Sequence, residues 1–117
     1  MNYMVVEPLE DSLYQGITLD LKIEKETKRV SLDLIYLEET DRWYVSLIDF
    51  QTNNAYLRNV PLLSSSIKNP NNLWLPFKHK RIGSLYCFPA SDNTSTENPS
   101  KDNLSEFVIV WSDGIGE

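Results

Sequence analysis

The sequence predicts an all-β protein, a small antiparallel β-barrel or sandwich of about seven strands with little helix. The first supporting observation is strict two-residue alternation, since side chains of a strand point alternately to opposite faces. The second is the presence of clusters of turn residues between short apolar runs. The third is the lack of a sustained 3.6-residue period. The alternation is clearest at residues 17–24, where Ile17, Leu19, Leu21 and Ile23 oppose Thr18, Asp20, Lys22 and Glu24.

Length and composition predict a single β domain over residues 1–117. A chain of 117 residues can bury roughly two thirds of the surface that it exposes when unfolded. The hydrophobic fraction of 41%, with three Trp, six Tyr and four Phe, is enough for a packed interior. The charged fraction of 24% is ordinary for a globular domain and argues against disorder.

The first half of the chain predicts a meander of antiparallel strands. An apolar run at residues 3–6 ends near Pro8 and suits a short edge strand. The alternating strand at 14–25 leads through a charged turn at 25–29 into a strand at 30–37. Ile35 and Leu37 add apolar side chains to the second face of that strand, so we expect it to lie centrally. Strands at 43–49 and 56–61 follow, joined by a hairpin turn at 51–54.

The second half is less regular. Residues 62–66 predict one turn of helix, and the Asn-Pro-Asn-Asn run at 69–72 is expected to interrupt regular secondary structure. Residues 84–88 and 107–111 are predicted to form the last two strands. Residues 89–103 form a long polar loop that we expect to contribute nothing to the core and to be either functional or disordered. Residues 112–117 are predicted to form a flexible tail.

No residue pattern predicts catalysis, so we expect no enzyme, no catalytic residue, no cofactor and no metal. His79 lies in a Lys-His-Lys-Arg cluster that is more typical of a solvated turn than of an anion site. Cys87 and His79 provide too few ligands for zinc, and Cys87 is better read as a small buried apolar residue. The glycines lack the spacing of a phosphate-binding loop.

Charge and hydropathy restrict the partners. The net charge of −6 repels phosphate backbones and anionic membranes, so we expect no nucleic acid and no membrane contact. We also expect no signal peptide and no membrane span, and a single cysteine suits a reducing compartment. The aromatic residues form either a stacking platform for sugars or bases, or a core with subunit interfaces, and we favour the second.

Several motifs together resemble a family of small phage tail proteins, the baseplate plug or hub-associated β-barrel proteins of contractile tails. The motifs are WYVSLID at 43–49, NVPL at 59–62, LPF at 75–77, GSL at 83–85, DNL at 102–104 and FVIVW at 107–111. The resemblance spans about residues 17–111. It implies a non-enzymatic virion component at the tail tip, assembled in the host cytoplasm, which packs with copies of itself or with hub and tube proteins.

From polarity and position, we predict that packing and contacts with these partners involve seven residues. They are Trp43, Tyr44, Trp74, Ser91, Asn93, Glu97 and Asp113. Two alternatives stay open. One is a small acidic binding or immunity-type protein that uses Glu24, Glu26, Glu38 and Glu39. The other is an oligosaccharide-binding module that uses Trp74.

Overall fold

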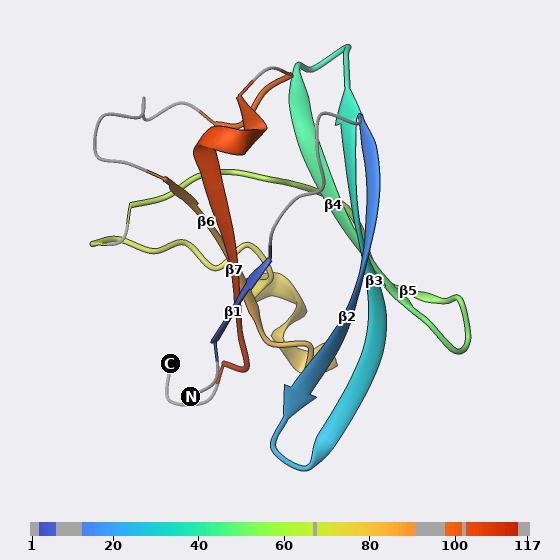
Figure 1. Ribbon diagram of the computed structural model, residues 1–117. Coiled ribbons are helices and arrows are strands. Elements are labelled where there is room, and N and C mark those ends of the chain that lie inside the picture. The colour runs from blue at the N-terminus through green and yellow to red at the C-terminus, as the bar shows by residue number, and fades with distance from the viewer. Residues whose placement is uncertain (1–2, 7–12, 67, 91–97, 102, 115–117) are drawn as a thin grey trace.

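The computed structural model describes residues 3–6, 13–66, 68–90, 98–101 and 103–114. These residues form seven strands in two antiparallel sheets, with four strands in one sheet and three in the other (Figure 1). The fold is therefore the sandwich of the two predicted alternatives, and not a closed barrel. In the part of the chain that the structure describes, no helix has the length and apolar character that crossing a membrane would need.

The four-stranded sheet is a meander with the order β2-β3-β4-β5. Its strands are β2 (Tyr14–Ile23), β3 (Glu26–Leu37), β4 (Arg42–Asp49) and β5 (Ala55–Pro61). The predicted turn at 25–29 was wrong, because residues 26–29 already belong to β3 and pair with residues 20–23. The turn is only two residues long, and Glu24 adopts a φ of 56° there without the Gly or Asn that usually marks such a position.

The central position predicted for the second strand of the meander is confirmed, since β3 pairs with β2 on one side and β4 on the other. Val30, Leu32 and Leu34 are fully buried on its inner face. Ile35 and Leu37 are half-buried on the opposite face. The alternation that predicted the sheet is therefore retained in the pattern of burial.

The second sheet joins the two ends of the described chain. Its order is β1-β7-β6, formed by β1 (Tyr3–Val6), β7 (Phe107–Ser112) and β6 (Ser84–Pro89). Tyr3 pairs with Ser112, so the sheet depends on contacts between residues far apart in the sequence. Its inner face carries buried side chains that complete the core with those of the meander: Val6, Leu85, Cys87, Phe107, Ile109 and Trp111.

Residues 62–83 connect the two sheets. The helical turn predicted at 62–66 was wrong, because these residues form no helix. Leu62 N–H donates to Trp43 O and Ser65 N–H donates to Cys87 O, so the segment links one sheet to the other. A 3-10 helix, η1 (Leu75–Lys80), follows and closes one end of the sandwich (Figure 1). His79 lies exposed on η1, so the solvated position predicted for it is confirmed, although on a helix.

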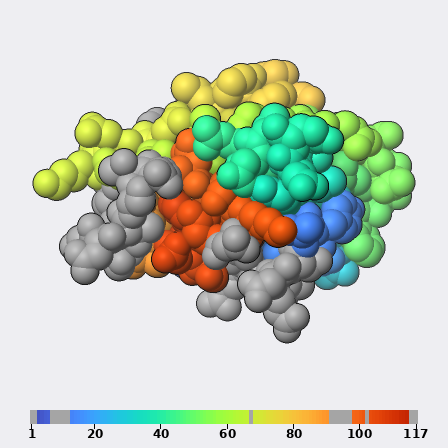
Figure 2. Space-filling view, turned by 90° about the horizontal axis from the view of Figure 1, so that it is seen from above, coloured from blue at the N-terminus to red at the C-terminus, as the bar shows by residue number. Residues whose placement is uncertain are grey.

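The last part of the polar loop is attached to the core, which the sequence did not predict. Pro99 is buried, the Trp43 indole Nε1 donates to Ser100 O at 2.8 Å, and Ser64 N–H donates to Asn98 Oδ1 at 2.8 Å. A second short 3-10 helix, η2 (Leu104–Glu106), leads into β7. From above, this segment lies beside the β3–β4 turn (Figure 2). Residues 91–97 of the loop lie outside the described residues.

The prediction of a flexible tail that starts at residue 112 was wrong. Ser112 is the last residue of β7 and is fully buried, and Asp113 is only 6% exposed. Gly83 packs directly against Ser112, which also pairs with Ser84 of β6. Residues 115–117 lie outside the described residues.

Candidate functional site

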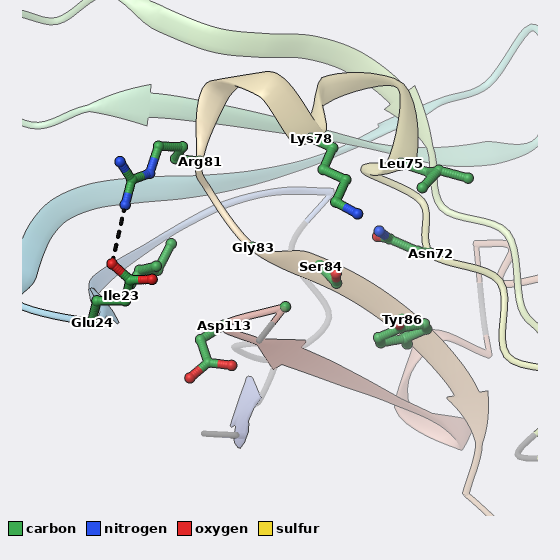
Figure 3. Close-up of a pocket in the computed structure, with 11 residues that line it drawn as sticks. Ile23, Glu24, Asn72, Leu75, Lys78, Arg81, Gly83, Ser84, Tyr86 and Asp113 are labelled. Atoms are coloured by element: carbon green, nitrogen blue, oxygen red, sulfur yellow. Dashed lines mark hydrogen bonds and ion pairs between the residues drawn. The ribbon is translucent and has the colours of Figure 1, made fainter. Parts of the chain in front are cut away.

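A pocket of about 340 Å³ lies at the end of the sandwich that η1 covers (Figure 3). It is formed where the β2–β3 turn, η1, the start of β6 and the residues after β7 meet. Its lining is mixed in polarity, and the side chains that matter below are Glu24, Asn72, Lys78, Arg81, Tyr86 and Asp113. A cleft with several polar groups is the usual form of a binding site.

Gly83 allows the chain to pass closely between η1 and β6. It adopts a φ of +86°, and a Cβ atom at this position would lie 2.3 Å from Ser112 O. The neighbouring Ile82 O accepts a hydrogen bond of 2.8 Å from the Trp111 indole Nε1. Only glycine combines this φ with such close contact, so Gly83 fixes the wall of the pocket.

Asn72 is held rigidly at the opposite side of the pocket. Its Oδ1 accepts hydrogen bonds from Trp74 N–H at 3.0 Å and from Leu85 N–H at 3.1 Å. Because the side-chain oxygen is occupied in this way, the Nδ2 amide group is the part of Asn72 available to the pocket. Asn72 therefore presents hydrogen-bond donors to a ligand.

Most of the cationic side chains near the pocket stabilise the fold. Lys28 Nζ donates to Arg81 O at 3.0 Å and to Lys80 O at 3.3 Å, and Lys80 Nζ donates to Tyr56 O. Arg81 forms an exposed ion pair with Glu24, with 3.4 Å between Nη2 and Oε2. The positive charges at this end therefore hold η1 on the four-stranded sheet.

Lys78 differs from these cations. Its ammonium group forms no hydrogen bond or ion pair with any residue that the structure describes. Figure 3 shows that it points toward the same part of the pocket as the Asn72 amide. Asp113, which is 6% exposed, also lines the pocket, and its carboxylate points away from Lys78. The pocket thus has a donor-rich region around Lys78 and Asn72.

The outer face of the three-stranded sheet is apolar over most of its area. We call it the apolar sheet face, and it consists of Tyr3, Val5, Tyr86, Phe88, Val108 and Val110. Tyr3 and Val5 are 66% and 58% exposed. The rings of Tyr86 and Phe88 stack with centroids 5.8 Å apart. Tyr86 also lines the pocket, so the pocket and the apolar sheet face are adjacent parts of one surface.

The predicted contact residues that the structure describes do not lie together on one surface. Trp43 and Trp74 are 2% and 1% exposed, so both indoles pack inside the chain and not on its surface. Tyr44 is half-buried on the outer face of the other sheet, where its hydroxyl donates to Thr40 Oγ1 at 3.0 Å. Asp113 lines the pocket. Three further predicted residues, Ser91, Asn93 and Glu97, lie outside the described residues.

The residues used by the two alternative functions are not arranged for them. Glu24 and Glu26 lie at one end of β3, whereas Glu38 and Glu39 lie beyond its other end, so the four carboxylates do not form one acidic surface. Trp74 is too deeply buried to stack on a sugar ring.

Sequence reasoning missed the apolar sheet face and the donors Asn72 and Lys78. The sequence does contain a signal for the apolar sheet face. The run FVIVW at 107–111 has apolar residues at both odd and even positions, as a strand covered on both faces would. For Asn72, the sequence indicates only that the residue lies in a loop. Its role depends on the backbone positions of Trp74 and Leu85.

The described residues include no cluster of three or more His, Cys, Asp or Glu side chains that could hold a metal ion. Cys87 is fully buried, as predicted, and burial raises the pKa of its thiol to about 12. A thiol held in its protonated form is a poor nucleophile and a poor metal ligand.

The sequence matches no protein-family model and none of the curated proteins with which it was compared.

Proposed function

We propose that this protein is a structural subunit of a phage or phage-like tail. It packs at the baseplate or hub near the tail tip, against other tail proteins and copies of itself, and it catalyses no reaction. In this proposal it is assembled in the host cytoplasm and resides in the virion tail. The observation that carries the proposal is the apolar sheet face, and the resemblance of the sequence motifs to those of small tail proteins supports it.

The physical argument starts from exposed apolar area. Single exposed apolar residues are normal, whereas a contiguous apolar face commonly marks an interaction surface. Tyr3 and Val5, which are 66% and 58% exposed, lie on the edge strand of this face. Burying an exposed valine side chain contributes about 1 kcal/mol or more to association. An edge strand adds backbone groups to which a neighbouring strand could bond.

The test is incorporation into tails. Tails are assembled by co-expression of this protein with the products of the adjacent genes, purified, and analysed by mass spectrometry. We expect the wild type and Thr18→Lys, on the exposed outer face of β2, to be incorporated. We expect Val5→Lys to be excluded, because it places a charge in the interface while changing a side chain that the isolated fold leaves exposed.

Circular dichroism and urea unfolding of both variants show whether the fold is retained. Sedimentation velocity of the isolated protein shows whether copies associate without other tail proteins. Wild-type protein that is missing from purified tails, or Val5→Lys that is incorporated as well as Thr18→Lys, contradicts the proposal.

A further inference from the structure

We propose that the pocket at the η1 end binds the carboxylate of an acidic side chain, presented by an extended segment of a neighbouring subunit. The identity of the neighbour rests on the proposed function. The binding chemistry rests on the pocket itself. Lys78 and Asn72 are the residues that would hold the carboxylate.

The two donors are arranged for an acceptor. Asn72 Oδ1 is occupied by two backbone N–H groups at 3.0 and 3.1 Å, so its Nδ2 group is directed to the pocket. Lys78 offers three further N–H donors, and its ammonium group points into the same region (Figure 3). A carboxylate accepts from both groups and gains a charge-assisted hydrogen bond to Lys78.

The charges around this region favour an anion at the Lys78 side. Glu24 is paired with Arg81 at 3.4 Å, and the Asp113 carboxylate points away from Lys78. Lys28 and Lys80 do not line the pocket, because Lys28 Nζ donates to Lys80 O and Arg81 O and Lys80 Nζ donates to Tyr56 O. An acidic side chain that enters the pocket on this side would therefore meet the available ammonium group of Lys78.

The adjacent surface indicates that the carboxylate belongs to a polypeptide. Tyr86 lines the pocket and also belongs to the apolar sheet face, where it stacks on Phe88. A segment that lies along this face would bury its apolar side chains there and reach the pocket with one polar side chain. The volume of about 340 Å³ accommodates a Glu or Asp side chain with its flanking backbone.

The test uses three short peptides and the isolated, isotope-labelled protein. Ac-Gly-Glu-Gly-NH₂ supplies a side-chain carboxylate, Ac-Gly-Gln-Gly-NH₂ is its neutral isostere, and Ac-Gly-Gly-Gly with a free C-terminus supplies a main-chain carboxylate. We expect saturable NMR shifts at Asn72, Lys78, Ser84 and Tyr86 with the Glu peptide, and none with the Gln peptide.

Two pocket variants and one matched control define the site. Lys78→Gln should weaken binding of the Glu peptide roughly tenfold, as loss of one charge-assisted hydrogen bond predicts. Asn72→Asp keeps the acceptor for Trp74 N–H and Leu85 N–H but replaces the pocket donors with a negative charge, so binding should be lost while urea unfolding is little changed. Lys68→Gln, exposed and outside the pocket, should bind like the wild type.

Equal binding of the Gln peptide, binding of the C-terminal carboxylate alone, or no shift with any peptide would overturn the inference. So would wild-type affinity in Asn72→Asp. None of these results affects incorporation into tails, which is measured separately with Val5→Lys, so failure here is distinguishable from failure of the proposed function.

Discussion

The three described glycines provide a graded test of how the chain closes around the pocket. Gly83 has a φ of +86°, and an added Cβ would lie 2.3 Å from Ser112 O and 2.6 Å from Trp111 Nε1. Gly114 has a φ of +78°, but its nearest neighbour would be Ser84 Oγ at 3.6 Å. Gly16 has no positive φ, and its Cβ would meet Asp33 Oδ1 at 3.3 Å.

These geometries predict different losses of stability on substitution by alanine. Gly114→Ala should cost about 1 kcal/mol, the cost of a left-handed backbone for a residue with a Cβ. Gly83→Ala carries the same cost and also forces backbone and indole atoms apart, which adds about 2–3 kcal/mol. Gly16→Ala should be close to neutral, because strand alanine is favoured over glycine by about 0.5 kcal/mol and the Asp33 side chain must move only slightly.

Urea unfolding followed by tryptophan fluorescence measures all three variants. The method is suitable because Trp43, Trp74 and Trp111 are 2%, 1% and 3% exposed in the folded protein. We expect the loss to rise in the order Gly16→Ala, Gly114→Ala, Gly83→Ala. A loss below about 1 kcal/mol for Gly83→Ala, or a larger loss for Gly114→Ala, would refute the close packing of Gly83 against β7.

Three further predictions concern the core and one exposed ion pair. Burial raises the pKa of the Cys87 thiol from 9.0 to about 12, so the stability due to the protonated thiol is present below pH 9 and is lost above it. Urea unfolding between pH 8 and 11 should therefore show that the free energy of unfolding of the wild type declines above pH 9 by up to about 1.4 kcal/mol per pH unit, a decline that Cys87→Ala lacks. Parallel pH profiles of the two proteins would contradict this prediction. Trp43→Phe should destabilise the protein by about 1 kcal/mol more than Trp74→Phe. The reason is that Trp43 Nε1 donates a hydrogen bond, whereas buried Trp74 Nε1 has no acceptor among the described residues. Equal losses of unfolding free energy in urea would argue against an effect of the hydrogen bond. The hydrogen bond from Arg29 lowers the pKa of Asp20, so an NMR titration should find the Asp20 pKa below its ordinary value in the wild type and higher in Arg29→Gln. The small contribution of this ion pair to stability should be lost only as the pH falls through the Asp20 pKa. An unchanged Asp20 pKa in Arg29→Gln would refute the role of Arg29.

The meander could be predicted from the sequence because its inner and outer faces differ in polarity. Alternation at 17–24 fixes which residues of β2 face the core, and Ile35 and Leu37 correctly indicated a central β3. Alternation does not fix where a strand ends, since Glu26 and Lys28 belong to β3 although they are charged. The turn was therefore predicted at 25–29 and not at Glu24, where the structure has it.

The site depended on contacts that a one-dimensional pattern does not contain. Pro99 is buried and Ser100 O accepts a hydrogen bond from Trp43 Nε1, although the sequence around them is polar. Trp43 and Trp74 were expected at interfaces because aromatic residues are common there, and they are equally common in cores. Asn72 acquires its role only when Trp74 and Leu85 are brought together by the fold.

The pairing of Tyr3 with Ser112 has a consequence for biosynthesis. The meander spans residues 14–61 and can form while the rest of the polypeptide is still being translated, since each strand pairs with its neighbour in sequence. The first strand must wait, because β7, its partner in the described sheet, is translated after the other described strands. Until then Tyr3 and Val5 have no sheet to join, and premature truncation before residue 107 would leave the inner apolar side of the meander uncovered and prone to aggregation.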